Sequence, residues 1–350
     1  MLKIGVIGLG SISSQHIKAY ANHSEVEIVA LCDTNEERLK EVGEQYGVTQ
    51  LYQSFTDLLR NKEIDAVSIC TWNNTHAAMS IAALEANKHV LVEKPLSITV
   101  KEALAVENAV GKSGKVLQVG FVRRFGKNAQ VLKRFIDEDE LGEIYYAKAS
   151  YLRRLGNPGG WFSDRSKSGG GPLIDLGVHM IDLCWYLMGK PNPVSVTGNT
   201  YKKLGNRSHI ENLSFYKAAD YNQEKNDVED LTNTLIRFDN GASLFVDVSF
   251  TLHSLKNELA VKLYGDKGGA ELEPELAIST EKHQTIINFK PQIDNESGQF
   301  ENSFNNEIKH FVASCLYGRE NMAPVSDGVQ IMKMLNAVYE SAETGKEIYL

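Results

Sequence analysis

The first 120 residues alternate between short apolar runs and segments of helical periodicity, and this alternation is the strongest constraint on the fold. Runs such as residues 67–70 (VSIC) and 89–92 (HVLV) are almost continuously apolar, as expected for parallel strands that helices cover on both faces. Amphipathic segments such as residues 35–47 lie between these runs. Repeated strand and helix units predict an α/β fold with a doubly wound parallel sheet.

The pattern changes after about residue 120. Residues 144–154 and 232–250 alternate apolar with polar positions and contain many aromatic residues, which predicts an antiparallel sheet with one exposed face. Asp239–Gly241 (DNG) is a hairpin signal between two such strands. The polar stretch 202–228 is expected to be a loop.

The chain has 350 residues, which is long for a single hydrophobic core. We therefore predict two domains: a nucleotide-binding domain over residues 1–122 and a substrate-binding and oligomerisation domain over residues 123–350. The second domain is expected to contain the open antiparallel sheet.

Composition excludes several classes of partner. A formal net charge of -8 argues against a surface that binds nucleic acid or anionic membranes. The N-terminal residues MLKIGVIGLG are not typical of a secretory leader, and no run of eighteen apolar residues occurs, so we expect a cytoplasmic protein. The cysteines form no CxxC pair, which indicates neither a disulfide framework nor a thiolate zinc site. They are Cys32, Cys70, Cys184 and Cys315.

A glycine-rich turn follows the first predicted strand. Gly8 and Gly10, with Ser11 and Ile12 at the start of the next helix, would direct backbone N–H groups toward a pyrophosphate. Ser13 stands where a third glycine is usual. A tight turn with no ligand is the alternative, but the position of this turn in the first strand-helix unit favours a dinucleotide.

Asp33 ends the second predicted strand, twenty-five positions after Gly8. A carboxylate at this point can accept hydrogen bonds from the adenosine ribose and repels a 2′-phosphate, which predicts NAD rather than NADP. Asp33 could instead, or in addition, cap the following helix, a role also open to Thr34 or Asn35. Arg38 could recruit a phosphate if its side chain folds back.

Lys94 follows a predicted parallel strand, at the sheet edge where open α/β folds bind ligands. Pro95 keeps the backbone of Lys94 out of the helical region and so restricts the direction of its side chain. The alternative is an exposed lysine paired with Glu93.

A second candidate group lies on an apolar helix that follows the glycine run 169–171 and Pro172. Three glycines would let another molecule approach the backbone closely. Asp175, His179 and Asp182 fall at i, i+4 and i+7, on one face of this helix. Buried ionisable groups need a partner or a function, so the alternatives are an active site and an internal Asp–His salt bridge. A metal site is disfavoured, because no further ligands accompany them.

Oxidation of a secondary alcohol would use all of these groups. A base must remove the hydroxyl proton while hydride leaves carbon, and His179 suits that role near neutral pH. Lys94 could polarise the oxygen, and Asp175 could orient the imidazole or hold a neighbouring hydroxyl. No motif for serine hydrolase, zinc protease or P-loop chemistry occurs.

Four segments are informative together: GLGSISSQH (8–16), Glu93–Pro95, GFVRRF (120–125) and GGGPLIDLGVHMID (169–182). They resemble the Gfo/Idh/MocA family of dehydrogenases, and the resemblance covers nearly the whole chain. The resemblance implies a Rossmann domain followed by an α/β domain with a large, mostly antiparallel open sheet, and an active site between them. It also implies Lys94, Asp175 and His179 as the catalytic trio, and a Lys94–Pro95 bond that is often cis. Homodimers or homotetramers through the open sheet face would be expected.

The resemblance extends to residues near the two ligands. Thr71, Asn73 and His76, in TWNNTH, match a family segment near the cofactor, and Glu93 and Lys94 are further cofactor candidates. Trp72 replaces the usual proline and would pack either beside the dinucleotide or at the edge of the core. For the substrate, the candidates are Arg123, Arg124, Trp161 and Asp164.

These observations predict an NAD-dependent dehydrogenase that acts on a CH–OH group of a sugar, inositol or related polyol. Two alternatives use the same fold. One is a sensor that binds cofactor or sugar without catalysis, since a fold does not determine a function. The other is a glycosidase that keeps NAD bound and uses transient oxidation.

Overall fold

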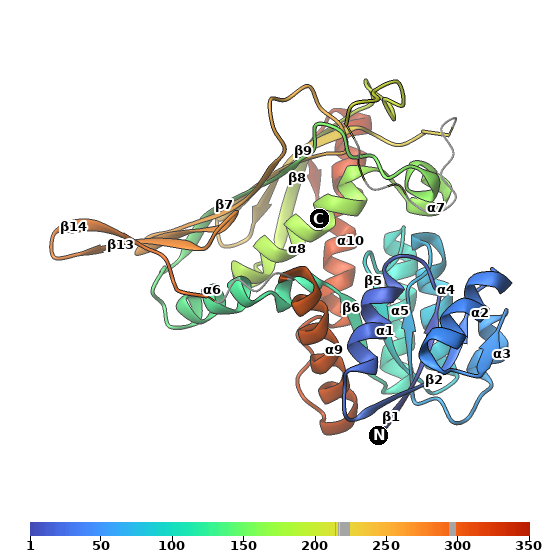
Figure 1. Cartoon of the computed structure of the whole chain (residues 1–350). Helices are drawn as coiled ribbons and strands as arrows, with labels where there is room; N and C mark the ends of the chain where they lie inside the picture. The colour runs from blue at the N-terminus through green and yellow to red at the C-terminus, as the bar shows by residue number, and fades with distance from the viewer. Residues whose placement is uncertain (214, 216, 218–224, 294–298) are drawn as a thin grey trace. The chain divides into compact units, whose positions relative to one another are not determined.

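Two compact units make up the chain (Figure 1). The computed structural model describes residues 1–213, 215, 217, 225–293 and 299–350. The first unit contains Met1–Val122 and Phe300–Met332, and the second contains Arg123–Gln299 and Lys333–Leu350. Residues 300–332, which the sequence-based division placed in the second domain, therefore pack within the first unit.

A parallel six-stranded sheet forms the centre of the first unit, as the alternating pattern predicted. The strand order is β3-β2-β1-β4-β5-β6, and every pair is parallel. The order reverses between β1 and β4, which is the point where open α/β sheets bind ligands. The strands are β1 (Leu2–Ile7), β2 (Val26–Cys32), β3 (Gln50–Tyr52), β4 (Ala66–Ile69), β5 (His89–Glu93) and β6 (Leu117–Gly120).

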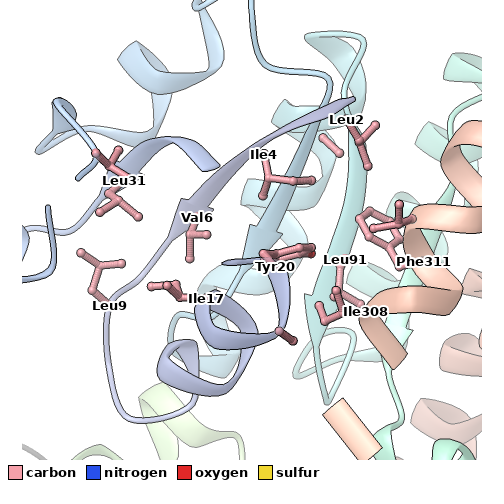
Figure 2. Close-up of a cluster of buried hydrophobic side chains, with 14 of the residues drawn as sticks. Leu2, Ile4, Val6, Leu9, Ile17, Tyr20, Leu31, Leu91, Ile308 and Phe311 are labelled. Carbon is pink, nitrogen blue, oxygen red and sulfur yellow. The ribbon is translucent and has the colours of Figure 1, made fainter. Parts of the chain in front are cut away.

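Helices from both ends of the chain cover this sheet. Figure 2 shows Ile17 and Tyr20 of the first helix, together with Ile308 and Phe311 of α9, in one apolar cluster that also contains Leu91. Burial of these side chains is the physical reason why residues 300–332 belong to the first unit. The helices are α1 (Ser13–Ala21), α2 (Glu36–Tyr46), α3 (Phe55–Leu59), α4 (Asn73–Glu85), α5 (Val100–Ser113), α9 (Gln299–Tyr317) and the first part of α10 (Val325–Thr344).

A nine-stranded sheet forms the second unit. Its order is β14-β13-β12-β11-β7-β10-β9-β8-β15, and all pairs are antiparallel except β7 with β10. The Asp239–Gly241 turn joins β9 to β10 as a hairpin, as predicted. The strands are β7 (Ile144–Leu152), β8 (Pro193–Tyr201), β9 (Leu231–Phe238), β10 (Ser243–Ser249), β11 (Glu258–Gly265), β12 (Gly268–Glu273), β13 (Ala277–Lys282), β14 (Thr285–Phe289) and β15 (Ile348–Tyr349).

One helix of the second unit lies against the middle of this sheet. Helix α8 contacts β7, β10 and β11 and buries most of its side chains. Of the expected loop 202–228, residues 214, 216 and 218–224 lie outside the described part, and the others form neither helix nor strand. The remaining helical segments are η1 (Val122–Phe125), α6 (Lys127–Asp137), η2 (Gly160–Ser163), α7 (Arg165–Ser168), the π-helical turn η3 (Leu173–Gly177) and α8 (Val178–Leu187).

Candidate active site

The candidate nucleotide residues gather at one edge of the parallel sheet. Strands β1, β2, β4 and β5 run parallel, so their carboxyl ends share that edge. Gly8, Asp33 and Lys94 directly follow β1, β2 and β5, and Thr71 comes two residues after β4. The fold therefore brings together residues that lie up to 86 positions apart in the sequence.

The two glycines of the turn differ in what limits them. Gly8 has φ +86°, and a Cβ there would lie 2.8 Å from the Cys70 carbonyl oxygen, so the position requires glycine. A Cβ on Gly10 would meet no atom within 4 Å, which leaves open space above the turn. Helix α1 has neither a side-chain cap nor an acidic residue in its first turn. These features fit a dinucleotide phosphate at the start of α1.

Asp33 holds the glycine-rich turn. Its Oδ2 accepts the N–H of Leu9 at 2.7 Å, and its Oδ1 accepts the N–H of Asn35 at 2.8 Å. The cap of α2 is Asn35, whose side chain accepts the N–H of Arg38. Arg38 Nη1 lies 3.6 Å from Asp33 Oδ2, so the arginine faces the carboxylate that disfavours a 2′-phosphate. Asp33 thus fixes the backbone of the turn and lies at the carboxyl edge of the parallel sheet.

Residues of the TWNNTH segment occupy different environments. His76 is completely buried, with Nδ1 2.7 Å from the Pro95 oxygen and Nε2 3.1 Å from the Thr71 oxygen. Burial lowers its pKa although both carbonyl groups oppose the shift. The His76 ring therefore braces the loop from inside, and its contact with a cofactor stays a prediction. Asn73 begins α4 and is 6% exposed, while Trp72 is 41% exposed and so does not belong to the core.

Glu93 and Lys94 also differ in burial, since Glu93 is buried and Lys94 is half-buried. Glu93 is buried, and its Oε1 lies 2.8 Å from Nε2 of His16, while its contact with the cofactor stays a prediction. Lys94 is half-buried, and its peptide bond with Pro95 is cis, as the family resemblance implied. His16 was missed by the sequence reading. His16 stands next to Ile17 on the buried face of α1. A histidine at such an apolar position was the sequence signal for a buried polar contact.

The polar stripe on the apolar helix separates into two parts in the second unit. Asp175 lies in the π-helical turn η3 and His179 in the first turn of α8, and both are partly exposed. Asp182 is 1% exposed. The predicted stripe of three site residues is therefore reduced to Asp175 and His179. Single π-helical turns occur frequently at functional sites, and the regular helical spacing did not reveal this one.

Asp182 and Arg124 form a completely buried ion pair. Arg124 Nε donates to both carboxylate oxygens at 3.1 Å, and Nη2 donates to Oδ1 at 2.6 Å. The guanidinium carbon lies 4.8 Å from the ring centre of Tyr186. The two charges therefore pair with each other inside the second unit, and an approach of Arg124 to a substrate stays a prediction. Arg123 is partly exposed, and its Nη1 lies 3.4 Å from Oε1 of Glu273. It stays a candidate for contact with the substrate.

The loop before the glycine run contains the other two substrate candidates. Trp161 is partly exposed, and its ring stacks on Phe162 with centroids 3.9 Å apart. Asp164 is 5% exposed and caps α7 by accepting from the N–H and hydroxyl of Ser166. Although burial raises its pKa, the contacts with Lys225 and Ser166 hold the pKa below its usual value. Asp164 therefore caps α7, and its substrate role stays a prediction.

Glu229 explains the glycine run and was not found from the sequence. Its carboxylate accepts the N–H groups of Gly171 at 2.9 Å and Leu173 at 3.2 Å, and the hydroxyl of Tyr339 at 2.8 Å. A Cβ on Gly170 would lie 1.9 Å from the Tyr339 oxygen. These glycines approach other parts of the same unit, where the sequence had suggested a ligand. Glu229 lies 58 residues beyond Gly171, and no local pattern indicates the contact.

The part of the chain that the structure describes contains neither a metal-binding cluster nor a membrane-spanning helix. No group of three or more His, Cys, Asp or Glu side chains there could hold a metal ion. Within the same residues, no helix is both long and apolar enough to cross a membrane.

Comparison with known proteins covers almost the whole chain. Residues 2–121 match the oxidoreductase family model described as an NAD-binding Rossmann fold, and residues 133–350 match the C-terminal alpha/beta domain of the same family. The chain belongs to the Gfo/Idh/MocA oxidoreductase family. The predicted fold class, with a Rossmann sheet followed by a mostly antiparallel sheet, is confirmed.

Relatives of this Gfo/Idh/MocA oxidoreductase include two proteins named as dehydrogenases. D-glucoside 3-dehydrogenase of Escherichia coli strain K12 is 32% identical over 355 residues, which cover 100% of this chain and 97% of that protein. Myo-inositol 2-dehydrogenase of Thermotoga maritima is 25% identical, with 100% and 98% covered. Among solved structures, an oxidoreductase domain protein from Kribbella flavida superposes with a TM-score of 0.88 at 24% identity, covering 99% and 98%.

Proposed function

We propose that this Gfo/Idh/MocA protein is an NAD-dependent dehydrogenase that acts on a ring secondary alcohol of a sugar, inositol or related polyol. The observation that supports this most directly is the cluster of Gly8, Gly10, Asp33 and Lys94 at the carboxyl edge of the parallel sheet. The cluster combines a binding site for a dinucleotide with the Lys94 ammonium group, which can stabilise negative charge on the oxygen of the reacting alcohol. The names of the relatives, a glucoside and an inositol dehydrogenase, support the choice of substrate class.

Several residues are assigned to cofactor and substrate. Open space above Gly10 and the absence of a side-chain cap on α1 fit the pyrophosphate of NAD. Bound nicotinamide would supply the hydride acceptor or donor. Arg123 and Trp161 are partly exposed substrate candidates, and the other substrate candidates are Asp164, Asp175 and His179. The proposed cofactor residues are Gly8, Gly10, Ser11, Ile12, Asp33, Thr71, Asn73, His76, Glu93 and Lys94.

The proposed catalytic trio is Lys94, Asp175 and His179. His179 takes the proton from the reacting hydroxyl during oxidation and returns it during reduction. The Lys94 ammonium stabilises negative charge on the same oxygen, which lowers the energy of the alkoxide. Asp175, one helical turn before His179, orients the imidazole or accepts a hydrogen bond from a neighbouring hydroxyl.

The two turn glycines should respond differently to alanine. Gly10→Ala adds a methyl group where the structure has open space, so the unfolding temperature should stay near wild type. The same methyl group would occupy space that the dinucleotide needs, and NAD affinity should fall about tenfold or more. Gly8→Ala should lower stability, because its Cβ would strike the Cys70 carbonyl oxygen. Calorimetric NAD titration with thermal unfolding of each variant measures both effects. Wild-type affinity in Gly10→Ala would contradict the placement of the cofactor.

Asp33 should determine the choice between NAD and NADP. Asp33→Ser removes the charge that repels a 2′-phosphate, so NAD should bind about tenfold more weakly and the gap to NADP should narrow. Asp33→Asn is the matched control for the turn, because its amide oxygen can still accept the Leu9 N–H. Titration of both variants with the two cofactors measures the effect. Unchanged preference in both would mean that Asp33 serves only the fold.

The function itself is tested by NADH formation at 340 nm. Purified protein is supplied with NAD or NADP and with a panel of inositols, aldoses, glycosides and amino sugars. Turnover of one of these compounds establishes the dehydrogenase together with its cofactor. Tight NAD binding without turnover would favour a sensor, and release of free sugar from a glycoside would favour the glycosidase.

We also propose that the protein is a cytoplasmic homodimer or homotetramer that associates through the open face of the nine-stranded sheet. Tyr146 and Tyr264 pair across β7 and β11, with ring centroids 5.5 Å apart, and Tyr264 is 39% exposed. Such an aromatic surface is suited to burial against a second copy. Light scattering after gel filtration, with Tyr264→Lys as the variant, tests the association.

The four cysteines are free thiols, in keeping with a reducing compartment.

A further inference from the structure

A buried histidine joins three elements of the parallel-sheet unit. His16 of α1 is completely buried. Its Nε2 lies 2.8 Å from Oε1 of Glu93 at the end of β5, and its Nδ1 lies 2.8 Å from Oγ of Ser68 in β4. One imidazole therefore connects the helix after the glycine-rich turn to two central strands.

The contact between His16 and Glu93 is an ion pair. Burial alone would lower the pKa of His16, but Cys70 and Glu93 raise it well above its usual value. For Glu93, burial raises the pKa, but His16, Lys94 and His76 together bring it below the usual value. The imidazolium then has two N–H groups, one for the Glu93 carboxylate and one for the Ser68 hydroxyl.

The same carboxylate holds the backbone of Lys94. Oε2 of Glu93 accepts the Lys94 N–H at 3.2 Å. Gly120 is the partner of Glu93 on β6, and a Cβ there would lie only 3.3 Å from Oε2, so the glycine leaves room for the carboxylate. Beyond Lys94, the Pro95 carbonyl oxygen lies 2.7 Å from Nδ1 of His76. Two buried histidines thus fix the backbone on either side of the lysine.

We propose that the buried His16–Glu93 pair is a positioning device for Lys94, which ties the backbone of this lysine to the helix that follows the nucleotide turn. For its catalytic consequence, the inference rests on the proposed function, in which Lys94 acts on the reacting oxygen. The pair itself does not touch the reacting atoms. Its removal should disturb Lys94 before it disturbs cofactor binding.

His16→Gln in the full-length protein is the test variant, and His310→Gln is the matched control. His310 is also a buried histidine of this unit, 4% exposed, and its Nδ1 contacts Gln118. Amide hydrogen exchange under native conditions, corrected for global stability, should be about tenfold faster at Lys94 in His16→Gln. The control should leave that amide unchanged. If His16→Gln does not fold, Glu93→Gln removes the charge and tests the same contact.

Kinetics with NAD and the identified sugar or polyol provide the second readout. His16→Gln should lower kcat about tenfold or more, while the KM for NAD stays within about threefold of wild type. Lys94→Ala should make this effect disappear, because the pair acts through the lysine. Unchanged exchange at Lys94, or a full additional loss of kcat in the double variant, would overturn the inference. If the wild type oxidises no compound, the proposed function fails, and the exchange result alone decides whether the pair positions Lys94.

Discussion

His179→Ala is expected to lower kcat for the sugar or polyol by about 10²- to 10⁴-fold, which is the usual contribution of a general base. His179 lies in the first turn of α8, and its partly exposed side chain can reach a ligand, while Asp182 on the same helix is buried. Alanine removes the proton acceptor, so oxidation would depend on water. NAD binding should change little, because no cofactor residue is altered.

Steady-state kinetics from pH 6 to 9, together with an NAD titration, measure this effect. His253→Ala is the control, since it removes an exposed histidine from the same unit. His179→Gln keeps a polar side chain of similar size but cannot accept the proton at neutral pH, so it should be nearly as slow as His179→Ala. Turnover near wild type in either His179 variant would show that another group takes the proton.

Asp182→Asn is expected to reduce the free energy of unfolding by about 3–5 kcal/mol, because it leaves the Arg124 guanidinium buried without its counter-charge. The pair is 0% and 1% exposed, and three hydrogen bonds join the two side chains. The double variant Arg124→Met and Asp182→Leu should recover most of the loss, since neither charge then remains in the apolar interior.

Thermal and urea unfolding of the wild type, Asp182→Asn and the double variant measure the loss and recovery of the free energy of unfolding. Glu271→Gln is the control for an exposed pair, because Lys262 and Glu271 are 34% and 53% exposed and should contribute less than about 1 kcal/mol. A small change in the free energy of unfolding of Asp182→Asn, combined with a large loss of substrate affinity, would indicate that Asp182 contacts the substrate.

Much of the architecture could be predicted from residues close together in the sequence. The run 89–92 is nearly continuously apolar because a parallel strand is buried on both faces. The run 232–250 alternates apolar with polar residues because its antiparallel strands are buried on one face only. The order of residues in the first strand-helix unit indicated the phosphate turn, where Gly8 has the positive φ that the turn requires.

The candidate site could be predicted only in part. Gly8, Gly10, Asp33 and Lys94 follow parallel strands, so a sheet of that kind brings them to one edge whatever else the chain does. The interior was harder to predict. His76, Glu93, Asp164 and Asp182 are polar residues in suggestive places, and the structure uses all of them for buried contacts or caps.

The sequence by itself therefore determined the two sheets, the glycine-rich turn and the Asp239–Gly241 hairpin, because each follows from the geometry and periodicity of neighbouring residues. The tertiary structure alone decided which buried charges meet, as Arg124 does with Asp182 across 58 positions. It also decided that Glu229 caps Gly171 and that residues 300–332 complete the first unit. Buried polar groups need partners, but no local pattern identifies a partner that only packing brings close.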